Sequence, residues 1–442
     1  MSGNKRIVEQ RTMMKEETRD YPPAWLGWLM WGLVAVLYLI GFFQRMAPAV
    51  MVEELMRDFQ LGGAFLGNLS AAYFYSYAAM QIPSGLLVDR IGARRLSTYA
   101  CAACAVGILI FSYGPNVWTA IIGRVVIGAS VAVAFVSCMK LAGHWFPVNR
   151  FATVTGVALL FGNIGGVLAG VPLSEAVALF GWRASLAASG FLTLATALVI
   201  WLVVRDDPGA YRYRSYAHAS VQQNGSLPSG VALKSVVSKR QTWLLFFAGG
   251  LSAAPVLVFA GLWGVPYLTQ IHGLTRSHAA TITTTMLIAW AIGGPVLGAI
   301  SDRLGRRKLP YLIANLTTTV GWAVFLLVDL PYQMFYPLLA LTGFTSGALI
   351  IGFAFSREVN HPGASGAVGG VVNMAVLGVA AIMQPALGAI LDGRWQGVLA
   401  GGARVYPAEA YGAAFLWFPI CAAVSVLMVL LTRESYCRME EA

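Results

Sequence analysis

The chain has 442 residues, of which 58% are hydrophobic and only 11% charged, and its formal net charge is +11. Soluble globular domains carry about 25% charged and about 45–50% apolar residues. The composition therefore excludes an ordinary soluble enzyme and indicates an integral membrane protein. It also excludes a DNA-binding protein, because an excess of Lys and Arg in cytoplasmic loops accounts for the basic charge of a membrane protein.

Apolar runs long enough to cross a bilayer recur along the chain. A membrane-spanning helix needs about 20 apolar residues, and such runs occupy residues 25–50, 63–88, 96–115, 117–143, 151–178, 183–204, 241–270, 277–300, 309–328, 333–356, 364–391 and 410–432. The sequence thus predicts an all-α integral membrane fold with twelve transmembrane helices.

A polar stretch at 205–240 divides these helices into two groups of six. It contains Pro, Gly, Ser and Asn without a sustained periodicity, which predicts a linker. We therefore predict an N-terminal tail at 1–24, a first half at 25–204, a second half at 241–432 and a C-terminal tail at 433–442.

The basic residues between the runs predict the orientation. Of the 30 Lys and Arg residues, 22 fall on the side that carries both termini and the linker, and 5 fall on the other side. Because cytoplasmic loops carry the excess of Lys and Arg, we expect both termini in the cytoplasm.

An internal repeat follows the second and the eighth predicted helix. The pattern G-x-x-x-D-R-x-G, followed by paired basic residues, occurs twice at an offset of 213 residues. The glycines permit close helix approach, and the aspartates could cap a helix or pair with an arginine. We predict that both copies gate the halves on the cytoplasmic side: Gly85, Asp89, Arg90, Gly92, Arg94 and Arg95, then Gly298, Asp302, Arg303, Gly305, Arg306 and Arg307.

The paired loops resemble the signature of the major facilitator superfamily, and the resemblance extends over essentially the whole chain. Arg124-x-x-x-Gly128-x-Ser130-x-Ala132 is similar to a second signature, whereas the antiporter signature of helix 5 is only loosely echoed at 162–172. The segments 38–45, 71–77, 81–83, 145–147 and 181–183 resemble the organic-anion branch. That resemblance implies a bacterial inner-membrane protein with a substrate site near the bilayer midplane, between two pseudo-symmetric halves.

The same resemblance implies that Arg45, near the end of the first helix, contacts a substrate carboxylate. A charged group within a span is a functional candidate because its insertion is costly; the alternative for Arg45 is an arginine that snorkels to the outer interface. Arg124 has a structural or proton-coupling alternative, and Lys140 could be an interfacial anchor. The predicted substrate-binding residues are Arg45, Tyr38, Gln44, Tyr75, Gln81, Arg124, Lys140, Asn163, Asn373 and Gln384.

Acidic residues are absent from the interiors of the first and fourth predicted helices. Glu358, at the end of the tenth, is the candidate for proton coupling, with an ion pair to Arg357 or a loop arginine as the alternative. Basic residues without a buried acid favour an anionic substrate and leave symport, exchange and facilitated diffusion open.

The expected function is transport of a small organic anion by alternating access. The alternatives are transport of a larger metabolite such as a siderophore or vitamin, drug efflux, or a transport-inactive scaffold or sensor. No phosphate-binding loop or catalytic motif occurs, and Cys101 and Cys104 lie in an apolar run without further ligands. We expect no enzyme activity, cofactor, metal or nucleic acid; the expected partners are a small molecule, lipid and a coupling proton, and the expected state is a monomer.

Overall fold

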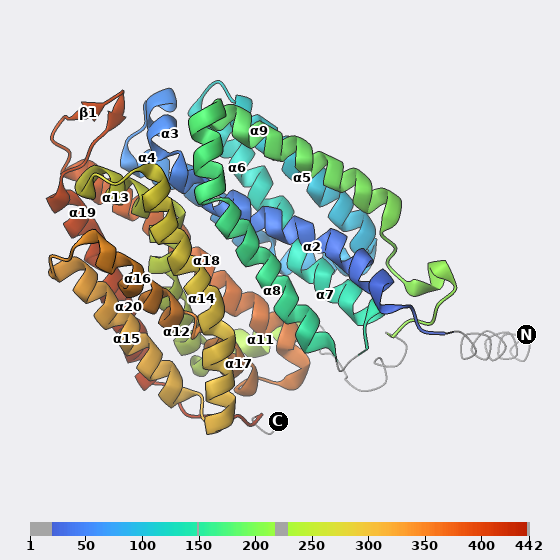
Figure 1. Cartoon of the computed structure of the whole chain (residues 1–442). Coiled ribbons are helices and arrows are strands. Elements are labelled where there is room, and N and C mark those ends of the chain that lie inside the picture. Colours follow the sequence, from blue (N-terminus) through green and yellow to red (C-terminus); the bar gives the residue numbers. More distant parts are fainter. Residues whose placement is uncertain (1–19, 148–149, 217–228, 440–442) are drawn as a thin grey trace, which may run out of the picture.

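The computed structural model describes residues 20–147, 150–216 and 229–439 and is a bundle of helices (Figure 1). Most of the predicted N-terminal tail lies outside the described residues. The first half contains α2 (Ala24–Met46), η1 (Ala47–Val50), α3 (Val52–Phe59), α4 (Gly63–Ile91), α5 (Ala93–Tyr113), α6 (Val117–Val131), α7 (Ala134–Trp145), α8 (Phe151–Leu168) and α9 (Val171–Val203), followed by η3 (Pro208–Tyr211).

The second half begins with α11 (Ser229–Ser238), which precedes its first long helix. It continues with α12 (Arg240–Val258), η4 (Phe259–Trp263), α13 (Gly264–His272), α14 (Arg276–Leu304), α15 (Lys308–Leu327), η5 (Tyr332–Met334), α16 (Phe335–Ser346), α17 (Leu349–Glu358), η6 (Pro362–Ala364), α18 (Ser365–Gly393), α19 (Ala408–Phe415) and α20 (Trp417–Leu430). Two short antiparallel strands, β1 (Leu399–Ala400) and β2 (Ala403–Arg404), pair in the loop between α18 and α19.

Ten segments of the described chain are long and apolar enough to cross a membrane. One of them, Thr153–Val203, holds two passes, because Gly181 has a φ of 77° and reverses the chain within α9. The 29-residue α4 is a further pass, packed along α6 and α18. The described residues therefore contain the twelve predicted spans, and the predicted helical membrane fold is confirmed.

The two faces of the bundle differ in what they carry. Figure 1 shows α3 and β1 at one end of the bundle and the C-terminal segment at the other. We call the end with the C-terminal segment and the start of α2 the termini side, and the opposite end the distal side.

The stretch predicted as a linker contains an ordered helix, α11, where it meets the second half. Ala232 and Val236 of α11 are buried against Val368 and Val372 of α18. This contact covers an apolar stripe that is too short to register as helical periodicity among the polar residues of the segment.

The halves meet mainly through two helix pairs, α4 with α18 and α8 with α14. On the distal side the contact is close: a methyl group at Gly67 of α4 would lie 2.5 Å from Cα of Pro385, and one at Gly63 would lie 2.8 Å from the carbonyl oxygen of Gly388. Only glycine allows the backbones to approach so closely.

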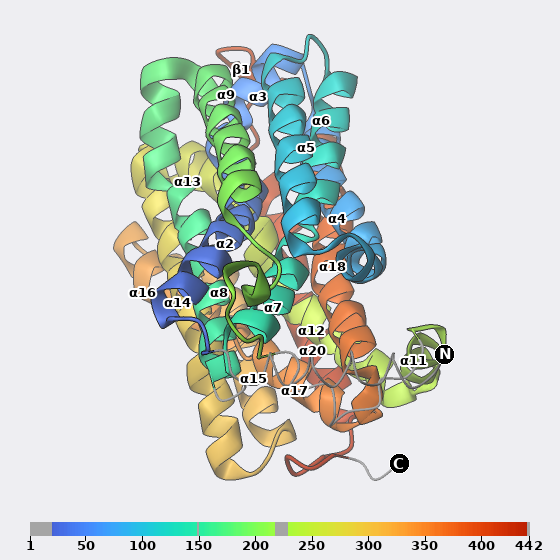
Figure 2. The same ribbon diagram turned by 90° about the vertical axis from the view of Figure 1, so that its right-hand side faces the viewer.

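Toward the termini side the same helices lose this contact. A methyl group at Gly85 of α4, Gly156 of α8 or Gly369 of α18 would meet no atom within 4 Å. The two views agree with a bundle whose halves are joined on the distal side and diverge toward the termini side (Figures 1 and 2).

Among the described residues, helical geometry changes within three spans and at the distal end of a fourth. The run of α2 tightens into η1, the run of α12 loosens into a π-helical turn at Phe259–Trp263, and short breaks separate α6 from α7 and α16 from α17. Irregular backbone at membrane depth is tolerated where protein covers it or where it lines a cavity, and π turns are frequent at functional sites. These breaks direct attention to the centre of the bundle.

Candidate functional site

Arg45, near the end of α2, lies at the centre of an aromatic cluster. Its guanidinium carbon is 4.3 Å from the ring centre of Phe42, 5.2 Å from Tyr77, 5.7 Å from Tyr73 and 5.9 Å from Phe74. The residue is only 5% exposed. Aromatic faces attract a cation more strongly when water is excluded, so the cluster holds the guanidinium away from solvent.

The charge of Arg45 has no acidic partner within the described chain. No Asp or Glu there forms an ion pair with it, and its Nε has no hydrogen-bond partner. A buried charge is costly unless it is paired and hydrogen-bonded. Arg45 is therefore suited to receive an anion.

Gln384, on α18 of the second half, is a second buried group with unused hydrogen-bonding capacity. Its side chain is fully buried, and neither Oε1 nor Nε2 has a partner. Its backbone oxygen accepts a hydrogen bond from Nε1 of Trp263 at 3.2 Å, at the end of the π turn. A methyl group at Gly261 in that turn would lie 3.3 Å from Sδ of Met46 and 4.0 Å from Nε2 of Gln384. Gln384 thus lies where α18, the π turn and the end of α2 meet.

Of the predicted tyrosines, Tyr75 lies at the contact between the halves and Tyr38 lies within the first half. The hydroxyl of Tyr75 donates to the carbonyl oxygen of Ala381 at 3.0 Å and so joins α4 to α18. Tyr38 is buried beside Phe42 on the face of α2 that meets Gly162 of α8. Its hydroxyl makes no hydrogen bond within the described residues.

Three predicted amides contribute less defined contacts. Asn163 Nδ2 donates to the carbonyl oxygen of Leu159 in its own helix at 2.8 Å. Asn373 and Gln81 are half-buried, and their side chains make no hydrogen bond within the described residues. Asn373 lies on α18, about 16 Å along the helix from Gln384 at 1.5 Å per residue.

Gln44 and Arg124 lie away from this interface, inside the first half. Arg124 is fully buried, and its two Nη atoms donate to the carbonyl oxygens of Gln44 at 2.6 Å and Ser70 at 3.2 Å. Nε2 of Gln44 donates to Ser189 of α9 at 3.0 Å. These contacts tie α2, α4, α6 and α9 together, and they favour the structural alternative for Arg124.

Lys140, on α7, contacts the first loop motif. Its Nζ donates to the carbonyl oxygen of Val88 at 2.7 Å and lies 3.3 Å from Oδ1 of Asp89. It therefore lies on the termini side, among the predicted gating residues. Asp89 is 77% exposed and has no partner from the second half among the described residues.

Both loop motifs turn at their shared glycine and are capped by an acidic residue. Gly92 and Gly305 have φ values of 88° and 63°, which only glycine adopts readily. Asp206 Oδ1 accepts from the backbone N–H of Arg94 at 2.6 Å, near the start of α5. Glu434 accepts from the backbone N–H groups of Arg307 and Lys308 at 2.8 and 3.0 Å, at the start of α15. A carboxylate at a helix N-terminus is stabilised by the unpaired N–H groups and the helix dipole.

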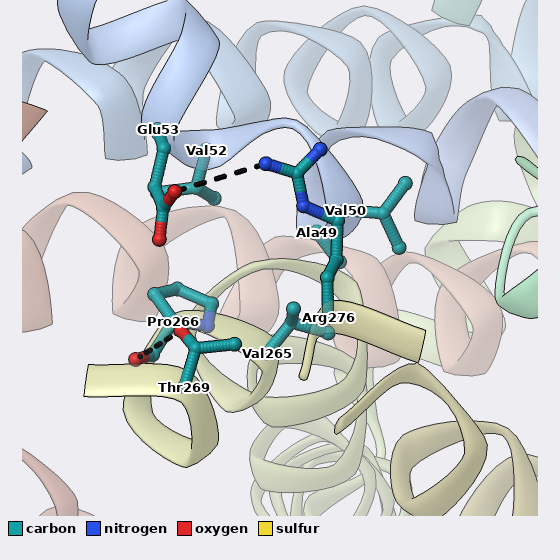
Figure 3. Close-up of a pocket in the computed structure, with 8 residues that line it drawn as sticks. All are labelled: Ala49, Val50, Val52, Glu53, Val265, Pro266, Thr269 and Arg276. Atoms are coloured by element: carbon teal, nitrogen blue, oxygen red, sulfur yellow. Dashed lines mark hydrogen bonds and ion pairs between the residues drawn. The ribbon is translucent and has the colours of Figure 1, made fainter. Parts of the chain in front are cut away.

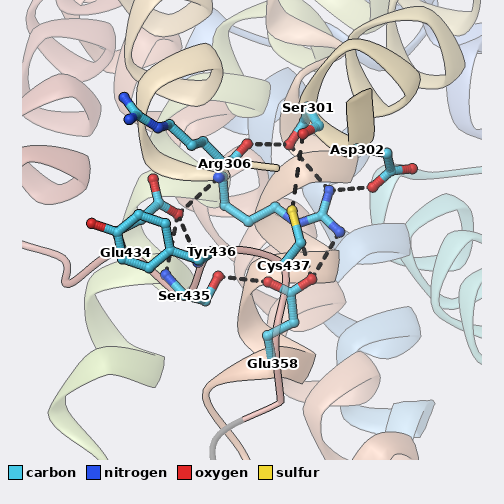
Figure 4. Close-up of polar contacts among 9 residues, drawn as sticks. Ser301, Asp302, Arg306, Glu358, Glu434, Ser435, Tyr436 and Cys437 are labelled. Carbon is cyan, nitrogen blue, oxygen red and sulfur yellow. Dashed lines mark hydrogen bonds and ion pairs between the residues drawn. The ribbon is translucent and has the colours of Figure 1, made fainter. Parts of the chain in front are cut away.

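Glu358 is held by the second loop motif and the C-terminal segment (Figure 4). Its Oε1 accepts from Nε and Nη2 of Arg307 at 2.9 and 2.8 Å, and its Oε2 accepts from Ser435 at 2.6 Å. Arg307 also pairs with Asp302 at 2.5 Å. Although burial lowers the pKa of Arg307, the hydrogen bonds to Glu358 and Asp302 raise it above its usual value. This geometry matches the loop-arginine alternative for Glu358.

The contacts that join the halves on the distal side were not anticipated from the sequence. Asp392, at the end of α18, accepts from the backbone N–H groups of Gly63 and Ala64 at 2.7 and 2.9 Å and so caps α4 of the other half. Arg404 and Tyr406 also bind this carboxylate, at 2.9 and 2.7 Å. We call Asp392 with its four partners the distal cap.

A second distal contact pairs Arg276, the first residue of α14, with α3 of the first half. Arg276 lies 2.6 Å from Oε1 of Glu54 and 3.7 Å from Oε2 of Glu53, beside a small cleft that Val265 and Thr269 also line (Figure 3). The sequence held one signal for this ion pair: few basic and few acidic residues fall in the distal loops, so Arg276 had few possible acidic partners there.

The chain is similar to known proteins in sequence and in structure. The model of the Major Facilitator Superfamily matches residues 34–265 and 245–436. A probable sulfoacetate transporter, SauU, of Cupriavidus necator is 24% identical over 62% of this chain, and the match spans 65% of that protein, just under two thirds of its length. The membrane sensor protein UhpC of Escherichia coli is 25% identical over 81% of this chain and 85% of its own.

Among solved structures, a bacterial homologue of the human lysosomal transporter Spinster, in an inward-facing and unoccupied conformation, superposes with a TM-score of 0.72. The superposition covers 95% of this chain and all of that one at 16% identity, which shows a common fold. The family match covers nearly all of both halves. The chain belongs to the Major Facilitator Superfamily.

Proposed function

We propose that this membrane transporter moves a small organic anion across the bacterial inner membrane by alternating access, as a monomer with both termini in the cytoplasm. The main support for this proposal is Arg45 on α2 of the first half. It is a buried cation with no acidic partner in the described chain. The relative SauU is described as a probable transporter of sulfoacetate, a small organic anion, and this supports the same substrate class.

In this mechanism the guanidinium of Arg45 binds the carboxylate or sulfonate, and the side chain of Gln384 forms hydrogen bonds with a polar group at the other end of the substrate. A guanidinium is suited to this role because its planar fork binds two oxygens at once. Binding from both halves would draw them together over the substrate. The present conformation, joined on the distal side, is then the one that exchanges substrate with the cytoplasm.

Rocking of the halves would break the distal contacts and bring the two loop motifs into contact with the opposite half. Asp89, exposed in this conformation, and the neighbouring Gly85 are placed to meet the second half when the termini side closes. The set proposed for gating therefore comprises the loop motifs on the termini side and the distal cap with the Arg276–Glu54 pair on the other.

The test measures uptake by purified protein in proteoliposomes. Sulfoacetate, succinate and gluconate are the anionic probes and glucose the neutral one, after a thermal-shift screen selects the anion that stabilises the protein. We expect R45A and R45K to abolish uptake and the thermal shift while the protein stays folded and monodisperse, since lysine lacks the fork. R57A is the matched control and should retain uptake: it removes an exposed distal arginine whose ion pair among the described residues is with its neighbour Asp58.

Near-normal uptake by both Arg45 variants would refute the anion clamp. A sensor is the second candidate, because the similarity to UhpC extends over 81% of this chain. Stabilisation of the wild-type protein by an anion, dependent on Arg45 but without flux in either direction, would support that candidate against transport.

A further inference from the structure

A groove on the outer surface of the first half is the strongest feature that the transport cycle leaves unused. It has a volume of about 760 Å³ and lies between α5 and α9. Its lining is apolar apart from Thr98 and the hydroxyl of Tyr99, and comprises Phe191, Leu194, Ala195, Ala197, Leu198 and Trp201. The groove is a shallow, outward-facing depression along α9, beside Thr98 and Tyr99 of α5, and the two helices pack against each other beneath it.

The groove runs along α9 toward the termini side and ends at two aromatic residues. Phe191 and Trp201 are ten residues apart, about 15 Å along a helix. The rings of Tyr99 and Trp201 lie 6.3 Å apart at its termini-side end, 56% and 39% exposed. Amphipathic aromatic rings favour the level of the lipid headgroups. The hollow therefore fits an acyl chain whose headgroup lies at this end.

Basic residues surround the end where the headgroup would lie. Arg94 places its guanidinium 4.8 Å from the ring centre of Trp201 and donates Nε and Nη2 to the carbonyl oxygen of Trp201 at 3.1 and 2.6 Å. Arg95 is exposed and has no hydrogen-bond or ion-pair partner in the part of the chain that the structure describes. It precedes Tyr99 by one helical turn and so lies on the same face of α5.

The remaining charges at this end leave a net positive site. Arg205, two residues beyond the end of α9, donates to the carbonyl oxygens of Leu202 and Val204. Asp206 is the acidic neighbour, and it is already occupied by the backbone N–H of Arg94 at 2.6 Å. Asp207 follows Asp206 and pairs with His144 at 3.2 Å. Both carboxylates are therefore engaged, while Arg95 has no partner among the described residues.

We propose that this groove binds an anionic phospholipid, with one acyl chain between α5 and α9 and the phosphate at Arg95 and Arg94. Basic sites between transmembrane helices on the cytoplasmic side are suited to anionic headgroups. The site takes its ligand from the leaflet on the termini side, and it is separate from the substrate site because it faces outward from the first half. A lipid bound here would bridge α5 and α9, next to the first loop motif.

The test uses the full-length protein in nanodiscs and quenching of Trp fluorescence by acyl chains that carry bromine. Brominated phosphatidylglycerol is compared with brominated phosphatidylcholine, and W201F isolates the contribution of Trp201. We expect Trp201 to be quenched at a mole fraction of phosphatidylglycerol about fivefold lower than that of phosphatidylcholine, as one basic contact to an anionic lipid provides about 1 kcal/mol. R95Q should remove this preference, and R306Q should keep it.

R306Q is the matched control because Arg306 is an exposed arginine of the second loop motif, away from the groove. Equal quenching of Trp201 by the two lipids in the wild type, or loss of the preference in both variants, would overturn the proposal. An absence of quenching by either lipid, together with dimeric protein in each disc, would overturn it in favour of a second copy of the chain at this face.

Discussion

Arg45 and Arg124 are both buried arginines of the first half, but their hydrogen-bond partners differ and favour different roles. Arg124 donates to two backbone oxygens, of Gln44 and Ser70, and its charge is used to hold helices together. Both guanidinium groups lie near aromatic rings and both have an unpartnered Nε, but Arg45 donates no hydrogen bond to a backbone oxygen among the described residues. From the sequence, Arg45 was expected to contact the substrate, whereas Arg124 had a structural or proton-coupling alternative. The contacts that Arg124 makes with two backbone oxygens agree with its structural alternative.

The contact between His144 and Asp207 provides a prediction about pH. Asp207 lies just beyond α9, 3.2 Å from Nδ1 of His144, and this hydrogen bond lowers the pKa of Asp207 from its ordinary 3.8 to about 2. A carboxylate with a depressed pKa adds stability above its unfolded value, and that stability is lost as the pH falls through its folded value. D207N should therefore lower the Tm at pH 7, and the difference from wild type should close between about pH 4 and 2.

The effect should be modest, because the side chain of Asp207 is 42% exposed and solvent screens the pair. Thermal unfolding of the two proteins in detergent, followed at several pH values, measures the difference. D89N is the control for the loss of an exposed carboxylate, and it should leave the Tm at pH 7 close to that of wild type because the side chain is 77% exposed. A constant difference between D207N and wild type from pH 7 to 2 would contradict the assignment.

At the scale of elements, the pairing of α4 with α18 depends on glycine. Gly63 and Gly67 let the backbones touch on the distal side, while Gly85 on the same helix touches nothing within 4 Å. From the sequence, close helix approach was predicted only for the loop-motif glycines, and no prediction was made for Gly63 or Gly67. The helix that packs against α4 depends on the conformation of the whole bundle, and this conformation cannot be deduced from local sequence patterns.

G67A should shift the conformational equilibrium. Its methyl group would lie 2.5 Å from Cα of Pro385 and 2.6 Å from the oxygen of Gln384, both backbone atoms that cannot rotate away. We expect the distal side to open, which double electron–electron resonance between nitroxide labels at Pro115 and Gln333 would detect as a longer distance. These positions are exposed, in distal loops of opposite halves. The half-buried Cys421 and Cys437 are replaced by alanine beforehand.

G32A is the matched control for this substitution, because a methyl group at Gly32 of α2 would meet nothing within 4 Å. It should leave the distance distribution unchanged. A distribution for G67A that coincides with that of wild type would show that the contact between α4 and α18 adapts to a methyl group.

For the whole molecule, the distal cap is the polar contact that holds the halves in the observed arrangement. D392N removes the charge that the N-terminus of α4 and Arg404 share, and it leaves an amide that accepts fewer hydrogen bonds. We expect a larger distal-open population in the same resonance measurement. E54Q, which weakens the pair with Arg276, should act in the same direction, and an unchanged distribution in the double variant would rule out a gating role for both contacts.

The sequence predicted the helical membrane fold and its twelve spans because these depend on hydropathy, which is a local property. The boundary near Gly181 was within a few residues for the same reason. The distal cap could not be predicted, because Asp392 and Gly63 are 329 residues apart and no pattern links them. Gln384 was singled out as a buried amide, but its place beside the π turn depends on a backbone irregularity that periodicity does not reveal.

The glycine contacts between α4 and α18 also have an entropic consequence. When two backbones meet directly, no long side chain loses its rotamers, so the glycine part of the distal contact carries little of the conformational entropy cost that the ordering of Arg404 or Arg276 incurs. The same surface gives up little when it parts. Two arrangements that differ by so few ordered groups can lie close in free energy, and a protein that must visit both in every cycle depends on that near balance.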